Sequence, residues 1–129
     1  MEKYPISKQN SSYLFNIVVP LFNAEKYIEK CLNSIIKQSY KKFHVQIVDD
    51  CSTDSSYDIA SSICNKHKNF EIIKNSRRLG ALNNIFNLLN KKIKEPSRTI
   101  DILIDGDDYL YSGDVLNILN EKYSETDCL

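Results

Sequence analysis

The segment IVVPLFNAEKYIEKCLNSIIKQSYKKFHVQIVDDCSTDSS, residues 17–56, decides the fold of this 129-residue chain. Its start belongs to a short run rich in β-branched residues, 15–20, which ends at a proline as a buried strand often does. Apolar residues then recur at helical spacing from Tyr27 to Ile36, after Asn23, which we expect to be the helix N-cap. A second strand-like run, His44–Val48, follows. This order predicts a parallel β-α-β unit.

The same alternation continues through the rest of the chain. Further predicted elements are a helix that starts after the N-cap residues 52–55, a strand at Phe70–Lys74, a helix at Gly80–Lys92, a strand at Ile100–Ile104 and a helix beginning at Val115. We therefore predict one α/β domain over residues 15–129, with a mostly parallel sheet flanked by helices and a flexible lead at residues 1–14. Ligands of such sheets bind outside the carboxyl ends of the strands.

Composition removes several classes of function. Seventeen Lys and Arg balance seventeen Asp and Glu, so the chain lacks the charge of a nucleic-acid binder or a membrane-surface protein. With three glycines, neither of the glycine-rich phosphate-binding loops can be written. The four cysteines form no CxxC pair, which indicates reduced thiols in the cytoplasm. We see no secretory signal and no apolar run near the about 20 residues of a transmembrane segment.

Two acidic clusters follow predicted strands. Asp49 and Asp50 come after the second strand, and Asp105, Asp107 and Asp108 come after the fourth. Parallel strands end at one edge of the sheet, so the clusters are expected to face one crevice. Carboxylates this close repel one another unless a cation or hydrogen-bond donors compensate, and Mg²⁺ or Mn²⁺ bridges carboxylates to substrate phosphates. Helix capping and turn formation are the alternative role, but two clusters at one edge favour a functional site.

These segments, together with ILIDGDDYL at residues 102–110, resemble the N-terminal half of the inverting family 2 glycosyltransferases of the nucleotide-diphospho-sugar transferase (GT-A) fold. The resemblance lies in the order and separation of P-x-aromatic-N, VDD-x-STD and DxDD, and it extends from Phe15 to the last helix. It implies a single Rossmann-like GT-A domain that is the nucleotide-sugar-binding portion of a longer enzyme, so that the chain is truncated.

The resemblance implies a site for the base of the nucleotide. Pro20, Leu21 and Phe22 match the stretch that flanks the nucleobase, and Asn23 follows them. Asp50 matches the acid that accepts a hydrogen bond from the uracil ring N–H.

The same resemblance places the sugar diphosphate at the second acidic cluster. Asp105 and Asp107, on either side of Gly106, match the acids that meet the ribose and, through Mg²⁺ or Mn²⁺, the diphosphate. Asp108 either shares in metal binding or holds the loop. Asp49 is included among the nucleotide-sugar-binding residues, although ordering the loop and the next helix start is its favoured role.

The stretch NSRRLGALNN, residues 75–84, resembles the family pattern N-x-G-x-x-x-A-x-N, with Asn75, Ala81 and Asn83 in register. Arg77 stands where the family has glycine. Arg78 is a candidate contact to base or phosphate, since a guanidinium suits phosphate oxygens; a solvated loop arginine is the equally open alternative.

The function implied is transfer of a sugar from a UDP-sugar, with inversion, to a hydroxyl of a glycan or lipid-linked acceptor in bacterial surface polysaccharide or lipooligosaccharide synthesis. The full-length enzyme is then expected in the cytoplasm, peripheral at the inner membrane, with no nucleic-acid partner. The family's general base lies after the DxD motif, so the catalytic residue is unassigned and this chain is expected to bind the donor only. Two alternatives remain: a phospho-receiver signalling module and a catalytically inactive binding fragment.

Overall fold

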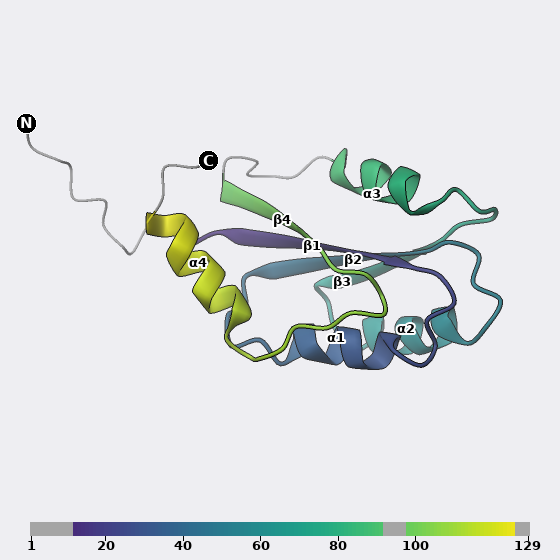
Figure 1. Ribbon diagram of the computed structural model, residues 1–129, viewed down its shortest axis with the longest axis horizontal. Helices are drawn as coiled ribbons and strands as arrows, with labels where there is room; N and C mark the ends of the chain where they lie inside the picture. The colour runs from purple at the N-terminus through teal and green to yellow at the C-terminus, as the bar shows by residue number, and fades with distance from the viewer. Residues whose placement is uncertain (1–11, 92–97, 126–129) are drawn as a thin grey trace, which may run out of the picture.

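The computed structural model describes residues 12–91 and 98–125. Within them lies one parallel sheet of four strands, in the order β3-β2-β1-β4. The strands are β1 (Leu14–Leu21), β2 (Phe43–Asp49), β3 (Phe70–Lys74) and β4 (Thr99–Leu103), and the helices are α1 (Ile28–Ile36), α2 (Ser56–Cys64), α3 (Ala81–Leu89) and α4 (Val115–Glu125). Helices α1 and α2 cover one face of the sheet, α3 lies over the other, and α4 lies beside the ends where the strands begin (Figure 1).

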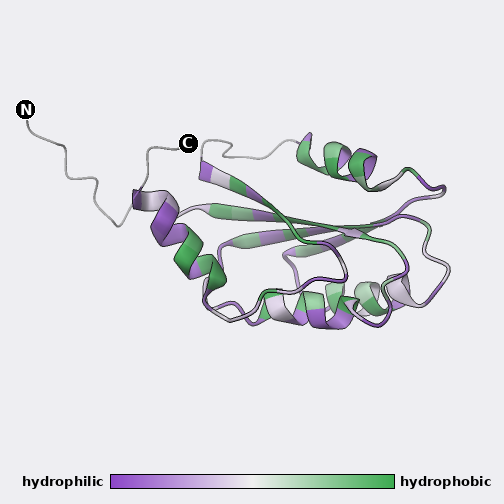
Figure 2. Ribbon diagram, in the orientation of Figure 1, coloured by the Kyte–Doolittle hydropathy of each residue, from purple (hydrophilic) through white to green (hydrophobic). Residues whose placement is uncertain are grey.

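The main core lies between the sheet and the α1–α2 layer. Alternate residues of β1, including Ile17 and Val19, are fully buried there against the inner side of α1, which presents Leu32 and Ile35. Full burial of one such side chain contributes roughly 1.5–3 kcal/mol. Figure 2 shows this apolar lining along the strands and on the sheet-facing side of α1. The parallel α/β sheet predicted from the sequence is therefore confirmed.

The opposite face of the sheet is covered more thinly. Val18 and Val48 form a small cluster there with Leu88 of α3. Leu82 and Phe86 of this hydrophobic helix are 80% and 64% exposed. Helix α3 thus rests on the sheet through a narrow contact and leaves part of its apolar surface uncovered.

Two sequence-based expectations differ from the structure. Asn23 is not the N-cap of α1, because that helix begins at Ile28; Asn23 instead has a left-handed backbone, with φ of 46°, and its Oδ1 accepts the Thr53 N–H at 2.8 Å. The fold also begins before residue 15, since Leu14 opens β1 and the Tyr13 N–H donates to Asn120 Oδ1 at 3.0 Å.

The remaining residues of the predicted lead, 1–11, lie outside the described residues, as does the end of the predicted helix Gly80–Lys92. In the described parts of the chain, no helix has the length and apolar character needed to cross a bilayer.

Hydrogen bonds connect the loop after β1 to the loop after β2. The Asn23 N–H donates to Ser52 Oγ at 3.0 Å, and the Ala24 N–H donates to Ser56 Oγ at 2.7 Å. In return, the Ser55 N–H donates to a carboxylate oxygen of Glu25 at 3.0 Å. The two loops are therefore fixed relative to each other at the carboxyl edge of the sheet, where the acidic clusters lie.

Candidate functional site

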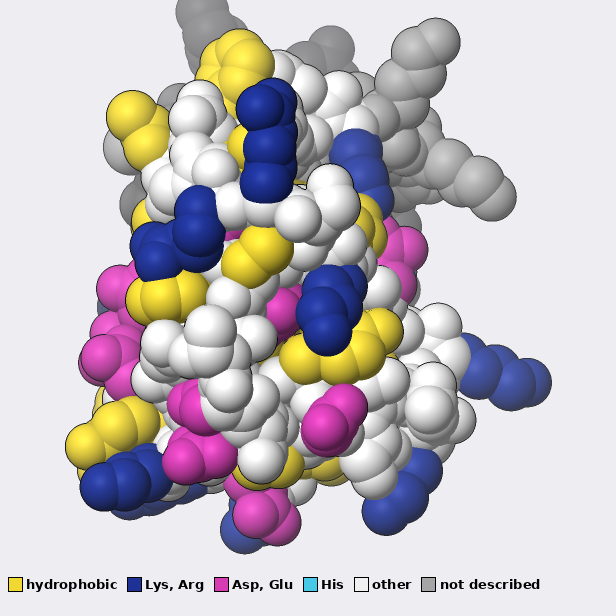
Figure 3. Space-filling model, turned by 90° about the vertical axis from the view of Figure 1, so that its right-hand side faces the viewer, with side chains coloured by type: hydrophobic (Ala, Val, Ile, Leu, Met, Phe, Trp, Pro, Cys, Tyr) yellow, Lys and Arg dark blue, Asp and Glu magenta, His cyan; other side chains and the backbone are white. Residues whose placement is uncertain are grey.

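A cavity of about 350 Å³ opens at the carboxyl edge of the sheet. Figure 3 faces this edge and shows acidic and basic side chains side by side with exposed apolar ones. The lining includes nine residues predicted from the sequence: Pro20, Leu21, Phe22, Asn23, Asp50, Arg78, Asp105, Gly106 and Asp107. Four further residues complete it: Ala24, Tyr27, Ala81 and Asn84. The structure therefore brings Asp50 of the first acidic cluster and Asp105 and Asp107 of the second to one cavity.

Asp50 is the most heavily bonded carboxylate of the site. Its Oδ1 accepts from Asn75 Nδ2 and the Leu79 N–H at 3.0 and 2.8 Å, and its Oδ2 accepts from Arg78 Nε and the Gly80 N–H at 3.1 and 3.0 Å. These bonds use the roughly four acceptor positions of a carboxylate. Gly80 has a φ of 85°, which glycine adopts without strain, so its N–H can reach Asp50.

The protonation of Asp50 follows from these contacts. Burial alone raises the pKa of this carboxyl, which is 3% exposed, but the hydrogen bonds from Leu79, Asn75 and Gly80 outweigh burial and hold the pKa well below its usual range. Asp50 is therefore negatively charged throughout the neutral range.

Acidification is expected to weaken the fold through Asp50. The pKa of Asp50 is lower in the folded state than in the unfolded state, so the ionised carboxylate contributes to the free energy of unfolding. This contribution is complete above the unfolded pKa, about 3.9, and it is lost as the pH falls through that value toward the folded pKa. Urea unfolding at pH 7, 5, 4 and 3 measures the free energy of unfolding. Asp50→Asn is expected to lose less of it between pH 5 and 3 than the wild type does, while Asp58→Asn, an exposed change on α2, should follow the wild type. Parallel losses in all three proteins would contradict this assignment.

The guanidinium of Arg78 lies over the Phe22 ring, and both residues line the cavity. Its guanidinium carbon lies 3.4 Å from the centroid of the Phe22 ring while its Nε holds Asp50. A guanidinium over an aromatic face is a favourable cation–π arrangement. Arg78 is thus bound on two sides, while its side chain remains 55% exposed to solvent.

Asp49 occupies a different position from Asp50. It is fully buried and does not line the cavity, and its Oδ2 accepts the Ser52 N–H at 3.2 Å. Among the described residues its Oδ1 has no hydrogen-bond partner. The contact to Ser52 agrees with the predicted role of ordering the loop before α2.

Asp105, Asp107 and Asp108 form an exposed acidic cluster. One carboxylate oxygen from each can be chosen so that all three lie within 4.8 Å of one another. Exposed carboxylates alone do not make a metal site, but oxygen donors of this kind suit a hard divalent cation such as Mg²⁺ or Mn²⁺. The residues present therefore fit the predicted metal.

Two contacts hold the backbone of this acidic cluster in place, one at Gly106 and one at Cys31. A side chain at Gly106 would place its Cβ 3.0 Å from Leu21 Cδ1 and 3.3 Å from the Pro20 carbonyl oxygen, so glycine lets this loop lie against the end of β1. The buried Cys31 thiol lies 3.7 Å from the Asp105 carbonyl oxygen. Burial, followed by the negative charge of Asp108, Asp107 and Asp105, raises the pKa of Cys31 to about 12, so this thiol stays protonated.

Asn84 is the most informative residue that we did not predict. It is 2% exposed and its Oδ1 accepts from Asn75 Nδ2 at 2.7 Å, which ties it to the partner of Asp50. Its own Nδ2 has no hydrogen-bond partner within the described residues. An amide at the fourth position of the nine-residue helix α3 was a possible signal, because a buried polar residue in a largely apolar segment needs a partner.

Comparisons with known proteins agree with this geometry. Residues 16–128 match the family described as glycosyl transferase family 2. The poly(ribitol-phosphate) beta-N-acetylglucosaminyltransferase TarS of Staphylococcus aureus (strain Mu50) is 36% identical over 100 residues, covering 74% of this chain and 16% of TarS. The poly(ribitol-phosphate) beta-glucosyltransferase of Bacillus spizizenii (strain W23) is 34% identical over 118 residues, covering 87% of this chain and 18% of that protein.

A solved structure gives the same result for the fold. The structure of S. aureus TarS 1-349 in complex with UDP-GlcNAc aligns with a TM-score of 0.72 and 31% identity, over 87% of this chain and 31% of that one. The predicted GT-A-type fold is confirmed, while the chain spans a minor part of the proteins that it matches.

The phospho-receiver alternative is wrong. Its acidic pair follows the first strand of the domain, whereas here the acids follow β2 and β4, on either side of the central β1. The family match covers residues 16–128, nearly the whole chain. This chain belongs to glycosyl transferase family 2.

Proposed function

We propose that this chain binds a nucleoside diphosphate sugar, a UDP-sugar, together with Mg²⁺ or Mn²⁺, as the donor-binding part of an inverting glycosyltransferase. The observation that carries the proposal is the meeting of an aromatic ring, a buried carboxylate and an acidic cluster in one cavity. The bound UDP-GlcNAc in the related TarS structure supports it.

The base end of the donor lies at Phe22 and Asp50 in this proposal. The Phe22 ring offers an apolar face, with Pro20, Leu21 and Asn23 forming the adjoining wall. Once Arg78 releases Asp50 Oδ2, that oxygen can accept the ring N–H of uracil, and the Nδ2 of Asn84, which has no hydrogen-bond partner among the described residues, can donate to a ring carbonyl. An anionic acceptor and an amide donor together match the edge of uracil.

The diphosphate end lies at Asp105 and Asp107, with Asp108 beside them. Their carboxylates would hold the cation, and a bound cation would neutralise the charge that develops on the leaving diphosphate. Gly106 keeps the loop against β1, so the two carboxylates on either side of it stay at the cavity. Once displaced from Phe22, the Arg78 guanidinium is available to phosphate oxygens, and Asp49 supports the loop from below.

Transfer itself needs an acceptor and a base. In the proposed reaction an acceptor hydroxyl attacks the anomeric carbon opposite the leaving diphosphate, so the configuration inverts, and a general base takes the hydroxyl proton. Among the described residues, the carboxylates that line the cavity are Asp50, Asp105 and Asp107, and each already has a role in holding the donor. We therefore propose that the 129-residue chain binds the donor without turnover.

The biological setting follows from the relatives. Two of them act on poly(ribitol-phosphate), so we propose synthesis of a bacterial surface polymer, with a glycan or lipid-linked acceptor. Cytoplasmic location, peripheral to the inner membrane in the full-length enzyme, is compatible with the free thiols of Cys31, Cys51 and Cys64.

Calorimetric titration of UDP into this chain tests the donor site. Binding is expected in the presence of Mn²⁺ and is expected to be lost, or strongly weakened, when EDTA removes the metal. Absence of binding under both conditions, in this chain and in the full-length protein, would overturn the proposal. Binding of UDP with equal strength in Mn²⁺ and EDTA would reject the metal role of the acidic cluster. Glycosyl transfer to an acceptor by the 129-residue chain would reject the donor-only role.

A further inference from the structure

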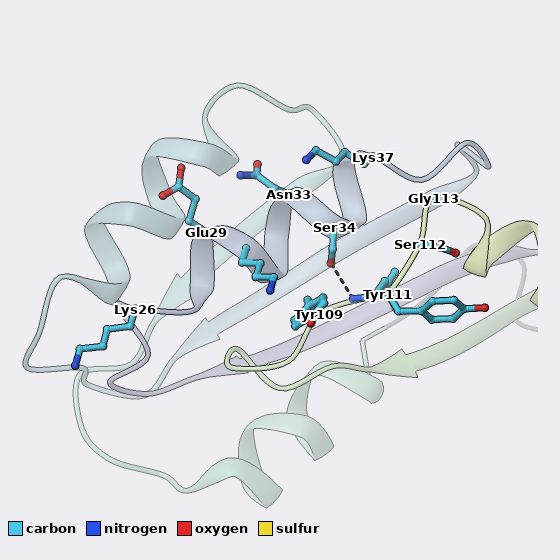
Figure 4. Close-up of a pocket in the computed structure, with 11 residues that line it drawn as sticks. Lys26, Glu29, Asn33, Ser34, Lys37, Tyr109, Tyr111, Ser112 and Gly113 are labelled. Carbon is cyan, nitrogen blue, oxygen red and sulfur yellow. Dashed lines mark hydrogen bonds between the residues drawn. The ribbon is translucent and has the colours of Figure 1, made fainter.

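The segment that follows the acidic cluster lies beside α1 and is held there by a few individual contacts. Residues 109–113 and the outer side of α1 border a hollow of about 520 Å³, whose lining residues are drawn in Figure 4. The Lys30 ammonium lies 3.8 Å from the centroid of the Tyr109 ring, from one wall of the hollow to the other. Because a hollow lies between the two walls, the position of this segment depends on single bonds more than on close packing.

The acidic cluster itself is a tight turn that is fixed at its start. The Asp108 N–H donates to the Asp105 carbonyl oxygen at 2.9 Å, which closes the turn, and the Gly106 N–H donates to the Pro20 carbonyl oxygen at 3.2 Å, which ties the turn to β1. Its three carboxylates lie close together and repel one another. The turn therefore tends to open unless its other end is held as well.

Ser34 of α1 holds that other end. Its Oγ accepts the Leu110 N–H at 3.0 Å, the contact dashed in Figure 4. Among the described residues this is the first hydrogen bond of the chain after the turn, two residues beyond Asp108. The Ser34 hydroxyl donates its own hydrogen to the Cys31 carbonyl oxygen, at 2.6 Å, in the same helix. The hydroxyl therefore faces the segment as an acceptor, in a direction that α1 fixes.

Gln38, just beyond the end of α1, holds the segment further along. It is fully buried, and its Nε2 donates to the carbonyl oxygens of Ser34 and Ser112 at 3.0 and 2.6 Å. Its Oε1 accepts the Leu116 N–H, at the start of α4, at 3.1 Å. Gln38 thus joins the backbone of α1 at Ser34 to the segment that Ser34 itself holds.

From these contacts we infer that Ser34 is a positioning residue for the divalent cation and that Gln38 supports it. The inference rests on the proposed function. Ser34 touches neither the cation nor the nucleotide. It keeps the exit of the turn in place, so that the carboxylates of Asp107 and Asp108 stay beside that of Asp105 before the cation binds. The free-energy cost of bringing like charges together is then met when the protein folds, and it does not reduce the affinity for the cation.

A role in the stability of α1 alone is the weaker explanation for this serine. Alanine stabilises the interior of a helix more than serine does, so the helix itself gains nothing from serine at position 34. What serine adds is the hydroxyl, and that hydroxyl reaches the segment that continues directly from the acidic turn.

The test compares Ser34→Ala and Ser34→Thr with the wild-type 129-residue chain. Threonine keeps a hydroxyl that can bond back within the helix as Ser34 does. The matched control is Ser61→Ala, which removes the hydroxyl of a half-buried serine of α2. Two titrations are made on each protein: Mn²⁺ alone, followed by the electron paramagnetic resonance signal of the free ion, and UDP in the presence of Mn²⁺, followed by calorimetry.

Two further measurements show whether the variants differ locally or as a whole. Urea unfolding gives the free energy of unfolding of each protein. Amide hydrogen exchange without metal gives the protection of the Leu110 N–H at the acidic turn and of the Leu79 and Gly80 N–H groups at Asp50. In Ser34→Ala we expect faster exchange at Leu110 and unchanged exchange at Leu79 and Gly80.

The affinity of Ser34→Ala for Mn²⁺, alone and with UDP, is expected to fall about three- to tenfold, as the net contribution of one hydrogen bond allows. Ser34→Thr and Ser61→Ala should stay within about twofold of the wild type. Unchanged affinity in Ser34→Ala, an equal loss in either of the other two variants, or a parallel loss of protection at Leu79 and Gly80 would overturn the inference. Absence of Mn²⁺ binding by the wild type, with and without UDP, would overturn it together with the metal site. Failure of UDP alone to bind rejects the proposed donor site, because the titration of Mn²⁺ alone reads the acidic cluster directly.

Discussion

Replacement of Asp50 by alanine is expected to lower the free energy of unfolding by about 3–5 kcal/mol, the cost of removing one side of a buried, charge-assisted network. The change leaves the N–H groups of Leu79 and Gly80 and the Asn75 amide without their acceptor, and Arg78 loses its anionic partner. Native domains are stable by only about 5–15 kcal/mol, so this loss is a large part of the total.

Urea unfolding at pH 7 measures this effect. Asp58→Ala, which removes an exposed carboxylate of α2, is the matched control and is expected to change the free energy of unfolding by less than about 0.5 kcal/mol. A loss below about 1 kcal/mol for Asp50→Ala would show that the loop 75–80 keeps its bonds by other means.

Replacement of Asp107 by alanine is expected to weaken Mn²⁺-dependent binding of UDP by about 100-fold or more, because loss of residues that merely support a metal ligand costs about 10–100-fold. The fold should be unaffected, since Asp107 is exposed at the cavity and its carboxylate has no hydrogen bond within the described residues. Loss of donor binding with unchanged stability separates a metal ligand from a structural residue.

Calorimetry with UDP and Mn²⁺, alongside urea unfolding, reads the two effects independently. Asp114→Ala is the control, because Asp114 is an exposed acid of the same loop region that does not line the cavity. Equal weakening in the two variants would indicate a general effect of negative charge. Unchanged binding in Asp107→Ala would remove Asp107 from the proposed metal site.

The fold could be predicted from the sequence because its strands are short apolar runs separated by helices of regular period. The run from residue 15 to 20 is buried almost throughout in β1, and the strand predicted at Phe70–Lys74 has the same bounds in the structure. Parallel pairing then brought the acids after β2 and β4 to one edge without further information. Nine cavity residues followed from that edge and from the family resemblance.

The rest depends on contacts between residues far apart in the chain. Asn23 looks like a helix cap, but its side chain meets Thr53, thirty positions away. Asp49 and Asp50 are neighbours in the chain, but Asp49 ends β2 and bonds to Ser52, whereas Asp50 follows the strand and bonds to the loop 75–80, which lies 25 to 30 positions away. The hollow between α1 and the segment 109–113 escaped prediction for the same reason, since residues of one helix border a hollow only when a distant segment lies against them.

Arg78 has one further consequence for the way a nucleotide enters. The same side chain covers the Phe22 ring and holds one oxygen of Asp50, so a single swing of Arg78 uncovers both at once. When a base binds, the Phe22 ring exchanges the Arg78 guanidinium for the base, and Asp50 exchanges Arg78 Nε for an N–H of the base. Stacking of the base on Phe22 replaces the contact of Arg78 with the same ring, so it adds only the difference between these two contacts to the binding free energy. Discrimination between bases then depends on the hydrogen bonds at the edge of the base. In the proposed donor site, Arg78 therefore has to release both Phe22 and Asp50 before a base can bind there.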